Sequence, residues 1–382
     1  MALVVSAFGV ALTPASAEPV PDPNGPDPIE EFLTANEIYF PWVPNGQMLG
    51  DSGPYTGDVV VQNVSLLFTI DLHFFVGVGT SEDSWDEAYV LNNVEPYAST
   101  TVSASDLGIE EPGASVYVEG RLQIDEEYED EFDELPLAPI SGSVKNVAPL
   151  ASSNALTSSA HDTVDGYTSM TRQQVAPISD DQHILPIVQN NTGWQTEIRL
   201  ASFGDEGSNT NYTIELFGTG DGAGDDSFST SGTFHSGEVR HYSISDLVDV
   251  DEGWVGSAYI TANAPVGAVA ERYKNETDML LTNVSRPVEQ PFVVDNSETG
   301  NGSVDRQAEA AGPELIYADN HRAIAPLVFQ EYNFWNTGIS VANTSDSPND
   351  VQIRFITPAG NQVGSEAFRI PPRGMKYLYL PG

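Results

Sequence analysis

Carboxylate clusters in two turns are the residues with the clearest capacity for chemistry. Asp205 opens the stretch Asp-Glu-Gly-Ser-Asn, and Asp221, Asp225 and Asp226 lie in Asp-Gly-Ala-Gly-Asp-Asp. Ca²⁺ takes six to eight oxygen ligands, which carboxylates and turn carbonyls can supply. Neither stretch has the spacing of a twelve-residue EF-hand loop or of a nonapeptide repeat, so solvated acidic turns are the alternative. Ca²⁺ is the one cofactor that these residues suggest, and we otherwise expect none.

Histidine offers a second, weaker metal signal. His235 and His241 flank Gly-Glu-Val-Arg in one expected hairpin, and His161 precedes Asp162 and Asp165. A zinc site needs three or four ligands at compatible positions. Because no third ligand stands at a fixed spacing, exposed strand residues are the favoured interpretation. The chain has no cysteine, which excludes disulfides and thiolate metal sites.

Ser52 is the candidate nucleophile. Gly50-Asp51-Ser52-Gly53-Pro54 resembles the serine block of trypsin-like proteases and that of GDS-type esterases. Such a serine needs a histidine base and an acid that orients it. Every histidine follows Ser52, which rules out the protease order, and Asp319-Asn320-His321 lacks the esterase spacing. We therefore expect no catalytic residue and a non-enzymatic protein, with a Ser52 hydrolase as the remote alternative.

The elements around these residues read as β-strands. Residues 184–217 contain two runs of alternating apolar and polar residues separated by a Gly/Asn/Ser-rich turn, the pattern of two half-buried antiparallel strands. No long helical period appears. The sequence predicts an all-β protein of tandem antiparallel β-sandwiches, Ig-like or jelly-roll-like.

The strand phrases recur along the chain. Pro41, Pro186 and Pro326 open them, and Tyr55, Trp194 and Trp335 begin a following alternating strand. This recurrence predicts that Trp194 is a core residue. The expected organisation is a signal peptide at 1–17, a Pro-rich acidic spacer at 18–35, sandwich modules at 36–174 and 175–290, a linker at 291–314 and a partial third module at 315–382.

The N-terminus and the charge bear on location. Residues 1–17 form an apolar run that ends in Ala-Ser-Ala, typical of the later part of a secretory signal peptide, although the basic start is missing.

The chain is strongly acidic: Asp and Glu number 56 against 14 Lys and Arg, which gives a net charge of −42. That charge argues against binding to nucleic acids or anionic membranes, and no segment is long and apolar enough for a membrane span. We interpret it as adaptation to high salt, with uptake of cations such as calcium as the alternative.

The repeated pattern of Pro, then aromatic-x-Thr-x-Ile-x-Val-x-Asn, then Gly-Ser-Ala-Tyr-Ile resembles Ig-like β-sandwich repeat modules of large bacterial secreted and cell-surface proteins. The resemblance implies a structural or adhesive role without a catalytic centre. The expected partners are other cell-surface or envelope components, glycans, or further copies of the chain. The alternative is an extracellular carbohydrate-binding or calcium-binding module that uses aromatic residues in loops, with candidates Trp85, Trp254 and Tyr332.

Asn-x-Ser/Thr triplets occur throughout and would be glycosylation acceptors only in a host that glycosylates its surface proteins. They begin at Asn63, Asn190, Asn211, Asn275, Asn283, Asn301 and Asn343.

Overall fold

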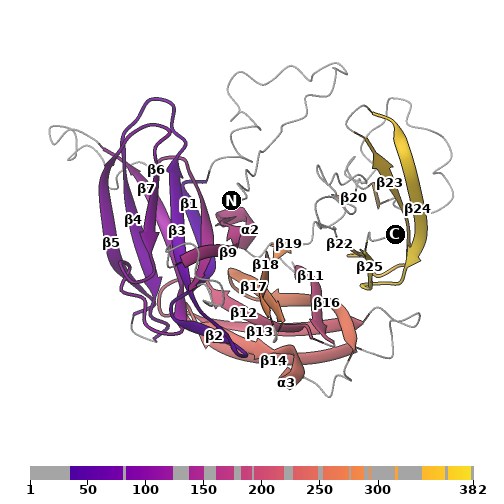
Figure 1. Ribbon diagram of the computed structural model, residues 1–382. Coiled ribbons are helices and arrows are strands. Elements are labelled where there is room, and N and C mark those ends of the chain that lie inside the picture. The colour runs from indigo at the N-terminus through magenta and orange to yellow at the C-terminus, as the bar shows by residue number, and fades with distance from the viewer. Residues whose placement is uncertain are drawn as a thin grey trace, which may run out of the picture.

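The computed structural model confirms the all-β prediction (Figure 1). It describes residues 35–80, 83–123, 137–149, 161–175, 182–191, 193–218, 227–247, 253–274, 277–287, 292–293, 315–316, 338–357 and 360–379. The expected signal peptide, the expected spacer up to residue 34 and most of the expected linker lie outside these ranges. Two sandwiches and a third set of strands follow one another along the chain.

The first sandwich consists of two antiparallel sheets. One has the order β10 (Met170–Thr171), β1 (Glu37–Pro44), β7 (Gly113–Leu122), β4 (Ile70–Gly77) and β5 (Trp85–Val94). The other has the order β2 (Gln47–Leu49), β3 (Ser52–Asn63), β8 (Ile140–Pro149) and β9 (His161–Thr168), with β6 (Ser99–Ser103) also paired to β3.

Alternation along each strand builds the core between these sheets. In β3 the buried residues Val59, Val61 and Asn63 alternate with half-buried ones. In β4, on the opposite sheet, the buried residues are Ile70, Leu72 and Phe74. Successive side chains of a strand point to opposite faces, so one face of each sheet enters the core and the other remains available for contacts.

The second sandwich repeats this plan. Its first sheet has the order β14 (Ser227–His235), β13 (Asn209–Gly218), β16 (Trp254–Ala262), β11 (Gln182–Asn190) and β19 (Arg286–Pro287). Its second sheet has the order β15 (Val239–Ser243), β12 (Gln195–Ser202), β17 (Val266–Lys274) and β18 (Thr277–Val284). Two single-turn helices, α2 (Arg172–Val175) and α3 (Ile244–Leu247), accompany the strands.

The C-terminal strands, yellow in Figure 1, form two antiparallel pairs. One pair is β22 (Gly338–Ala342) with β25 (Met375–Tyr379), and the other is β23 (Asn349–Ile356) with β24 (Gln362–Ile370). A further short pair joins β20 (Phe292–Val293) to β21 (Leu315–Ile316). We call the β22–β25 region the third segment.

The core prediction for Trp194 is wrong. Thr196, Ile198 and Leu200 are buried as the alternation of their strand requires, but Trp194 is only half-buried. It precedes β12 and forms an isolated bridge with Asn191, so the strand period does not extend to it. Tyr55, at the matching position of the first sandwich, is buried.

Strand registers define equivalent positions in the three regions. Tyr117 of β7 pairs with Tyr39 and Phe75, as Tyr259 of β16 pairs with Ile184 and Glu215. A second set of pairs, again at matching positions, is Gln62 with Ser99, Ala201 with Val239 and Ala342 with Met375.

Candidate functional site

Of the predicted calcium ligands, only Asp205 lies in the described residues, so the calcium site stays a prediction. Asp205 is exposed in the loop between β12 and β13, while Asp221, Asp225 and Asp226 lie outside the described ranges. Within the part of the chain that the structure describes, no group of three or more His, Asp or Glu side chains is placed to hold a metal ion.

Ser52 is an unsuitable nucleophile where it stands. It pairs with Leu49 in the tight β2–β3 hairpin, and only 4% of it is exposed. A nucleophile must reach the carbon that it attacks, so a hydroxyl this deeply buried cannot meet a substrate without local opening. His321, from the imperfect esterase pattern, lies outside the described residues.

The two hairpin histidines have separate structural contacts. The Arg199 guanidinium donates to Nδ1 of His241 at 2.6 Å, and the imidazole packs edge-on against Trp42. Burial, together with Arg199, lowers the pKa of His241 to about 4, so the ring accepts the hydrogen bond as a neutral group. The backbone N–H of His235 donates to the Glu238 carboxylate. His241 nevertheless keeps enough of its surface exposed to fit the expectation of an exposed strand residue, whereas His235 is half-buried.

Two asparagines of the glycosylation triplets are structural. Asn63 is fully buried; its side-chain amide donates to the carbonyls of Phe68 and Val94, and its side-chain oxygen accepts from the Ser65 N–H. Asn343 occupies the equivalent place before the β22–β23 loop and is also buried. A glycan cannot be attached to either side chain while these loops are folded.

The contact between the first and second sandwiches brings polar, charged and aromatic side chains together. One part is a buried ion pair on the outer face of β12 and β17. Arg199 Nε lies 2.9 Å from Glu271 Oε2, and only 1% of the Glu271 side chain is exposed. The Gln47 side chain of the first sandwich donates to the same carboxylate oxygen at 2.7 Å. The Arg199 guanidinium also lies over the Trp42 ring, 5.3 Å from its centroid.

Both sandwiches bind the buried Glu271 carboxylate: Arg199 of the second sandwich forms the ion pair and Gln47 of the first donates a hydrogen bond. A buried carboxylate is costly unless ion pairs and hydrogen bonds replace its water. Part of that replacement comes from Gln47, which itself accepts a hydrogen bond from the Trp42 indole. Separation of the sandwiches would therefore remove a hydrogen bond from Glu271 and expose its ion pair to water.

A second part of this contact is aromatic. Phe203, in the loop that follows β12, stacks on Trp85 with the ring planes 8° apart and meets the edge of Tyr39. Tyr117 packs between Trp85 and Phe75 on the outer face of the first sandwich. Trp85 is therefore not an exposed loop aromatic: it belongs to β5 and contributes to this interface.

The third part is a close backbone approach. The Ser115 hydroxyl donates to the Gly237 carbonyl at 3.0 Å, and the Trp85 indole donates to Ser236. A Cβ on Gly237 would lie 2.0 Å from the Ser84 carbonyl oxygen. The β14–β15 turn is thus seated directly on β7, β4 and the start of β5.

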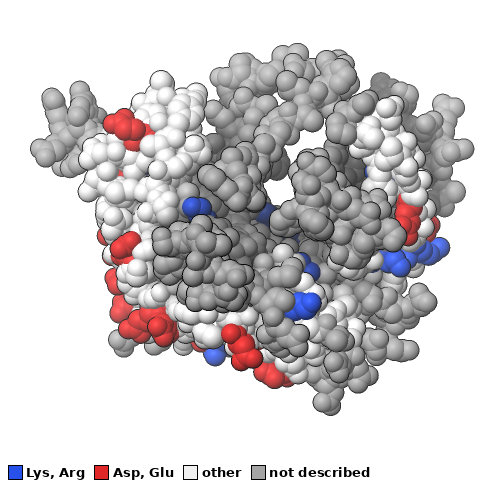
Figure 2. All heavy atoms as spheres, viewed as in Figure 1, with Lys and Arg blue, Asp and Glu red and all other residues white. Residues whose placement is uncertain are grey.

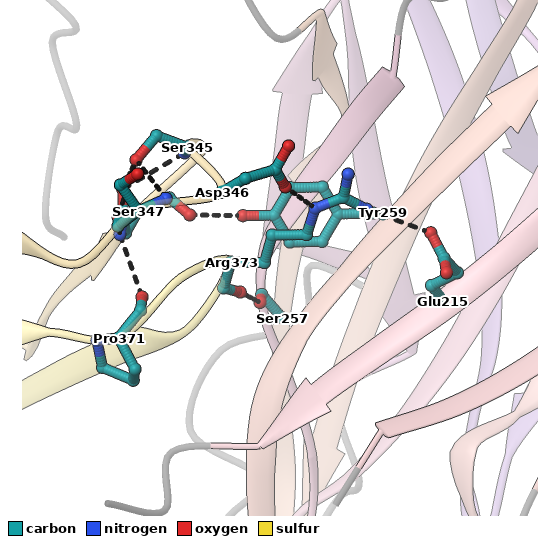
Figure 3. A network of polar contacts seen from close by, with 9 residues as sticks. Glu215, Ser257, Tyr259, Ser345, Asp346, Ser347, Pro371 and Arg373 are labelled. Atoms are coloured by element: carbon teal, nitrogen blue, oxygen red, sulfur yellow. Dashed lines mark hydrogen bonds and ion pairs between the residues drawn. The ribbon is translucent and has the colours of Figure 1, made fainter. Parts of the chain in front are cut away.

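The contact between the second sandwich and the third segment repeats this arrangement (Figure 3). The Ser257 hydroxyl donates to the Arg373 carbonyl at 3.3 Å, and the Tyr259 hydroxyl donates to the Asn343 carbonyl at 2.8 Å. The Arg373 side chain reaches between Asp346 of its own segment and Glu215 of β13.

The two contacts use equivalent residues. Ser115 and Ser257 each stand two residues before the paired tyrosine, Tyr117 or Tyr259. Gly237 and Arg373 each stand two residues before the equivalent strand pair, and both have positive φ, 77° and 52°. We call this arrangement the junction: the outer face of one sheet accepts the turn and the loop of the next region.

Sequence reasoning did not find the junction. Its signal is the shared phrase Ser-x-Tyr at Ser115–Tyr117 and Ser257–Tyr259, which strand patterning assigns only to alternating faces. The pattern predicts that these serines and tyrosines are solvent-exposed, because they lie on the face of each sheet opposite the core and one face of an antiparallel sheet is commonly in water.

Comparisons with known proteins add no family. No protein-family model and no curated protein matches the chain. One solved structure, Bacteroides uniformis beta-glucuronidase 2 covalently bound to cyclophellitol-6-carboxylate aziridine, is similar over 60% of this chain at 8% identity. The chain spans about a quarter of that protein, with 24% covered, and the TM-score is 0.13.

Proposed function

We propose that this chain is an exported, non-enzymatic structural or adhesive protein of the cell surface, built from repeated β-sandwiches and adapted to high salt. The observation that carries the proposal is the junction. The Ser115–Gly237 and Ser257–Arg373 hydrogen bonds recur at equivalent register positions. Domains that only need to be joined are separated by linkers and move independently by default, whereas a buried, repeated contact fixes their relative orientation. Fixed orientation is what a stalk or scaffold requires.

The distribution of charge supports the salt adaptation. On the face shown in Figure 2, acidic side chains gather along the left side, over the first sandwich, and at the bottom, while basic ones are spread over the centre and right. Two of the arginines form ion pairs at the contacts between regions: Arg199 in the first junction and Arg373 in the second. Screening over about 8 Å or less at physiological salt and above reduces the mutual repulsion of the remaining carboxylates.

The proposed export rests on the sequence of residues 1–17, and the absence of cysteine is compatible with it. Among the residues that the structure describes, none forms a helix with the length and apolar character needed to cross a membrane. Fusion of residues 1–35 to a reporter that is active only outside the cytoplasm tests export directly.

The rigid arrangement is tested by small-angle X-ray scattering of the full chain across a salt series. We expect the scattering at high salt to fit one fixed arrangement of the two sandwiches, and the fit to worsen only as salt is withdrawn. A profile at high salt that requires an ensemble of orientations would remove the basis for a scaffold role.

A further inference from the structure

The Asn-x-Ser/Thr triplets differ in whether the folded chain leaves them accessible. An N-linked glycan is attached to the side-chain nitrogen of the asparagine, and the hydroxyl residue two positions later must also be within reach of the transferase. The structure describes four triplets in full, which begin at Asn63, Asn211, Asn283 and Asn343. Residues outside the described ranges belong to the triplets at Asn190, Asn275 and Asn301.

Three of the four described triplets are closed. Asn63 and Asn343 are buried, and their side-chain amides hold the loops that follow them. The Asn283 side-chain nitrogen is buried as well. The third residue of that triplet, Ser285, is fully buried, and its hydroxyl accepts a hydrogen bond from the Ala268 N–H at 2.9 Å. A transferase cannot reach these groups without local opening of the fold.

The Asn211 triplet is open. Asn211 lies near the start of β13, and its side chain is exposed. Its neighbours Tyr212 and Ile214 are core residues. Because successive side chains of a strand alternate, Asn211 and Thr213 lie on the opposite, outer face of the sheet. The Asn211 Oδ1 accepts from the Thr233 hydroxyl at 2.7 Å, while no described residue accepts a hydrogen bond from its Nδ2. The amide is therefore held by its oxygen, and its nitrogen remains available.

The surface beside Asn211 consists of short hydroxyl side chains. Asn211 pairs with Thr233 of β14 and Thr213 pairs with Ser231, and both partners are exposed. β14 is the edge strand of this sheet and lies beside β13 at the bottom of Figure 1. Short side chains leave room for a bulky oligosaccharide, and their hydroxyl groups can form hydrogen bonds with it.

The same face carries the second junction further along the strand. Glu215, which meets Arg373, stands four residues after Asn211, or about 13 Å away at about 3.3 Å per residue. A glycan on Asn211 can therefore extend over β14 without displacing the third segment.

We infer that Asn211 carries an N-linked oligosaccharide in the exported protein. The donor is, by chemical class, a lipid-linked oligosaccharide phosphate or pyrophosphate, used by an oligosaccharyltransferase. One N–H bond of the Asn211 amide breaks, and its proton goes to a base of the transferase. A bond forms from Nδ2 to the anomeric carbon of the sugar. The bond from that carbon to the phosphate oxygen breaks, and the lipid phosphate leaves with the electron pair, so nothing is oxidised or reduced.

The inference rests on the proposed export, because such transferases act on the side of the membrane away from the cytoplasm. Its failure can be told apart from a failure of export. The reporter fusion of residues 1–35 tests export alone, and an exported chain without the glycan would overturn only the inference about Asn211.

Peptide mapping of the protein from the cells that naturally make it tests the inference. Trypsin cleavage after Arg199 and Arg240 releases residues 200–240, which contain no Asn-x-Ser/Thr triplet besides that of Asn211. We expect mass spectrometry to find this peptide heavier by the mass of an oligosaccharide, with sugar fragment ions. The triplets at Asn63 and Asn343 should be unmodified.

Four variants expressed in the same cells locate the attachment. Asn211→Gln and Thr213→Val should each remove the glycan, whereas Thr213→Ser, which keeps a hydroxyl, should retain it. Asn209→Gln is the matched control, because Asn209 is exposed on the same strand but begins no triplet. Its electrophoretic mobility should equal that of the wild type. Thr213→Val leaves Asn211 in place, and unchanged urea unfolding of this variant would show that the lost sugar does not reflect misfolding.

Three outcomes overturn the inference: an unmodified 200–240 peptide from the exported protein, a glycan that survives Asn211→Gln, or a glycan that survives Thr213→Val. The second outcome would place the sugar on a serine or threonine of the same peptide.

Discussion

Gly237 provides the sharpest test of the junction. Its φ of +77° favours glycine, but Tyr97 and Arg373 adopt similar values at equivalent positions with full side chains. The conformation alone therefore does not demand glycine. The neighbouring Ser84 carbonyl does, because a Cβ on Gly237 would lie 2.0 Å from its oxygen. We predict that Gly237→Ala forces the second sandwich away from the first.

The cost can be estimated from the contacts that separation breaks. The left-handed conformation costs an alanine about 1 kcal/mol. Loss of the Ser115–Gly237 hydrogen bond adds about 1 kcal/mol. The contacts of Phe203 with Trp85 and Tyr39 contribute about 1 kcal/mol or more between them. The expected loss of stability is about 3–4 kcal/mol.

Gly108→Ala is the matched control. Gly108 has φ +66°, and nothing lies within 4 Å of a Cβ built on it. Gly108→Ala should cost only the left-handed conformation, about 1 kcal/mol. Urea unfolding followed by tryptophan fluorescence measures both variants, and small-angle scattering reports the arrangement of the sandwiches. Equal losses of unfolding free energy in the two variants, with unchanged scattering, would show that Gly237 is not needed for the contact between the sandwiches.

Three further changes test separate parts of the fold. Burial lowers the pKa of His183 from 6.5 to about 4, so between these pH values the unfolded chain binds a proton that the folded chain does not. The free energy of unfolding should be level above about pH 6.5 and fall by up to about 3 kcal/mol toward pH 4. A plot of melting temperature against pH should have a smaller slope for His183→Leu than for the wild type. An identical slope in the two proteins would contradict this. Glu271→Leu leaves Arg199 buried without its carboxylate and should lower the free energy of unfolding in urea by about 3–5 kcal/mol. The double variant Arg199→Leu/Glu271→Leu should regain most of this loss, because no unpaired charge remains. A double variant no more stable than the single one would rule out an uncompensated charge as the cause. Asn63→Ala removes three hydrogen bonds of a buried side chain and should cost about 3 kcal/mol in urea unfolding. The exposed Asn92→Ala should cost less than about 0.5 kcal/mol. Comparable losses in the two variants would show that the loop does not depend on Asn63.

The strands could be predicted from the sequence because each is a local, two-residue period. Val59 and Val61 alternate with half-buried neighbours, and this pattern survives without knowledge of the partner strand. The failure at Trp194 shows the limit of that reasoning. A repeated sequence pattern places equivalent residues in equivalent turns. It does not predict that a residue such as Trp194 is buried, because the strand period applies only once the strand has begun.

The junction could not be predicted in the same way, because it depends on which outward face another domain covers. Tyr39 and Tyr117 alternate with core residues and look like half-exposed surface until Phe203 packs beside them. The burial of Glu271 likewise arises from contacts with residues distant along the chain, above all Gln47. Interfaces between domains combine faces that are far apart in sequence, and a periodic pattern carries no information on their pairing.

The position of the junction residues has a consequence for how such a chain can change in length. Ser115 and Ser257 lie on accepting strands, and Gly237 and Arg373 lie on the turns that follow. The second sandwich therefore carries both halves of the contact, one for the region before it and one for the region after it. Duplication of the whole second sandwich would present the Gly237 turn to the Ser257 strand and keep the shared serine hydrogen bond at the new boundary. Its deletion would instead bring Arg373 against the Ser84 carbonyl, which leaves no room for a Cβ at the position of Gly237. Recombination between repeats would thus lengthen the protein more readily than shorten it.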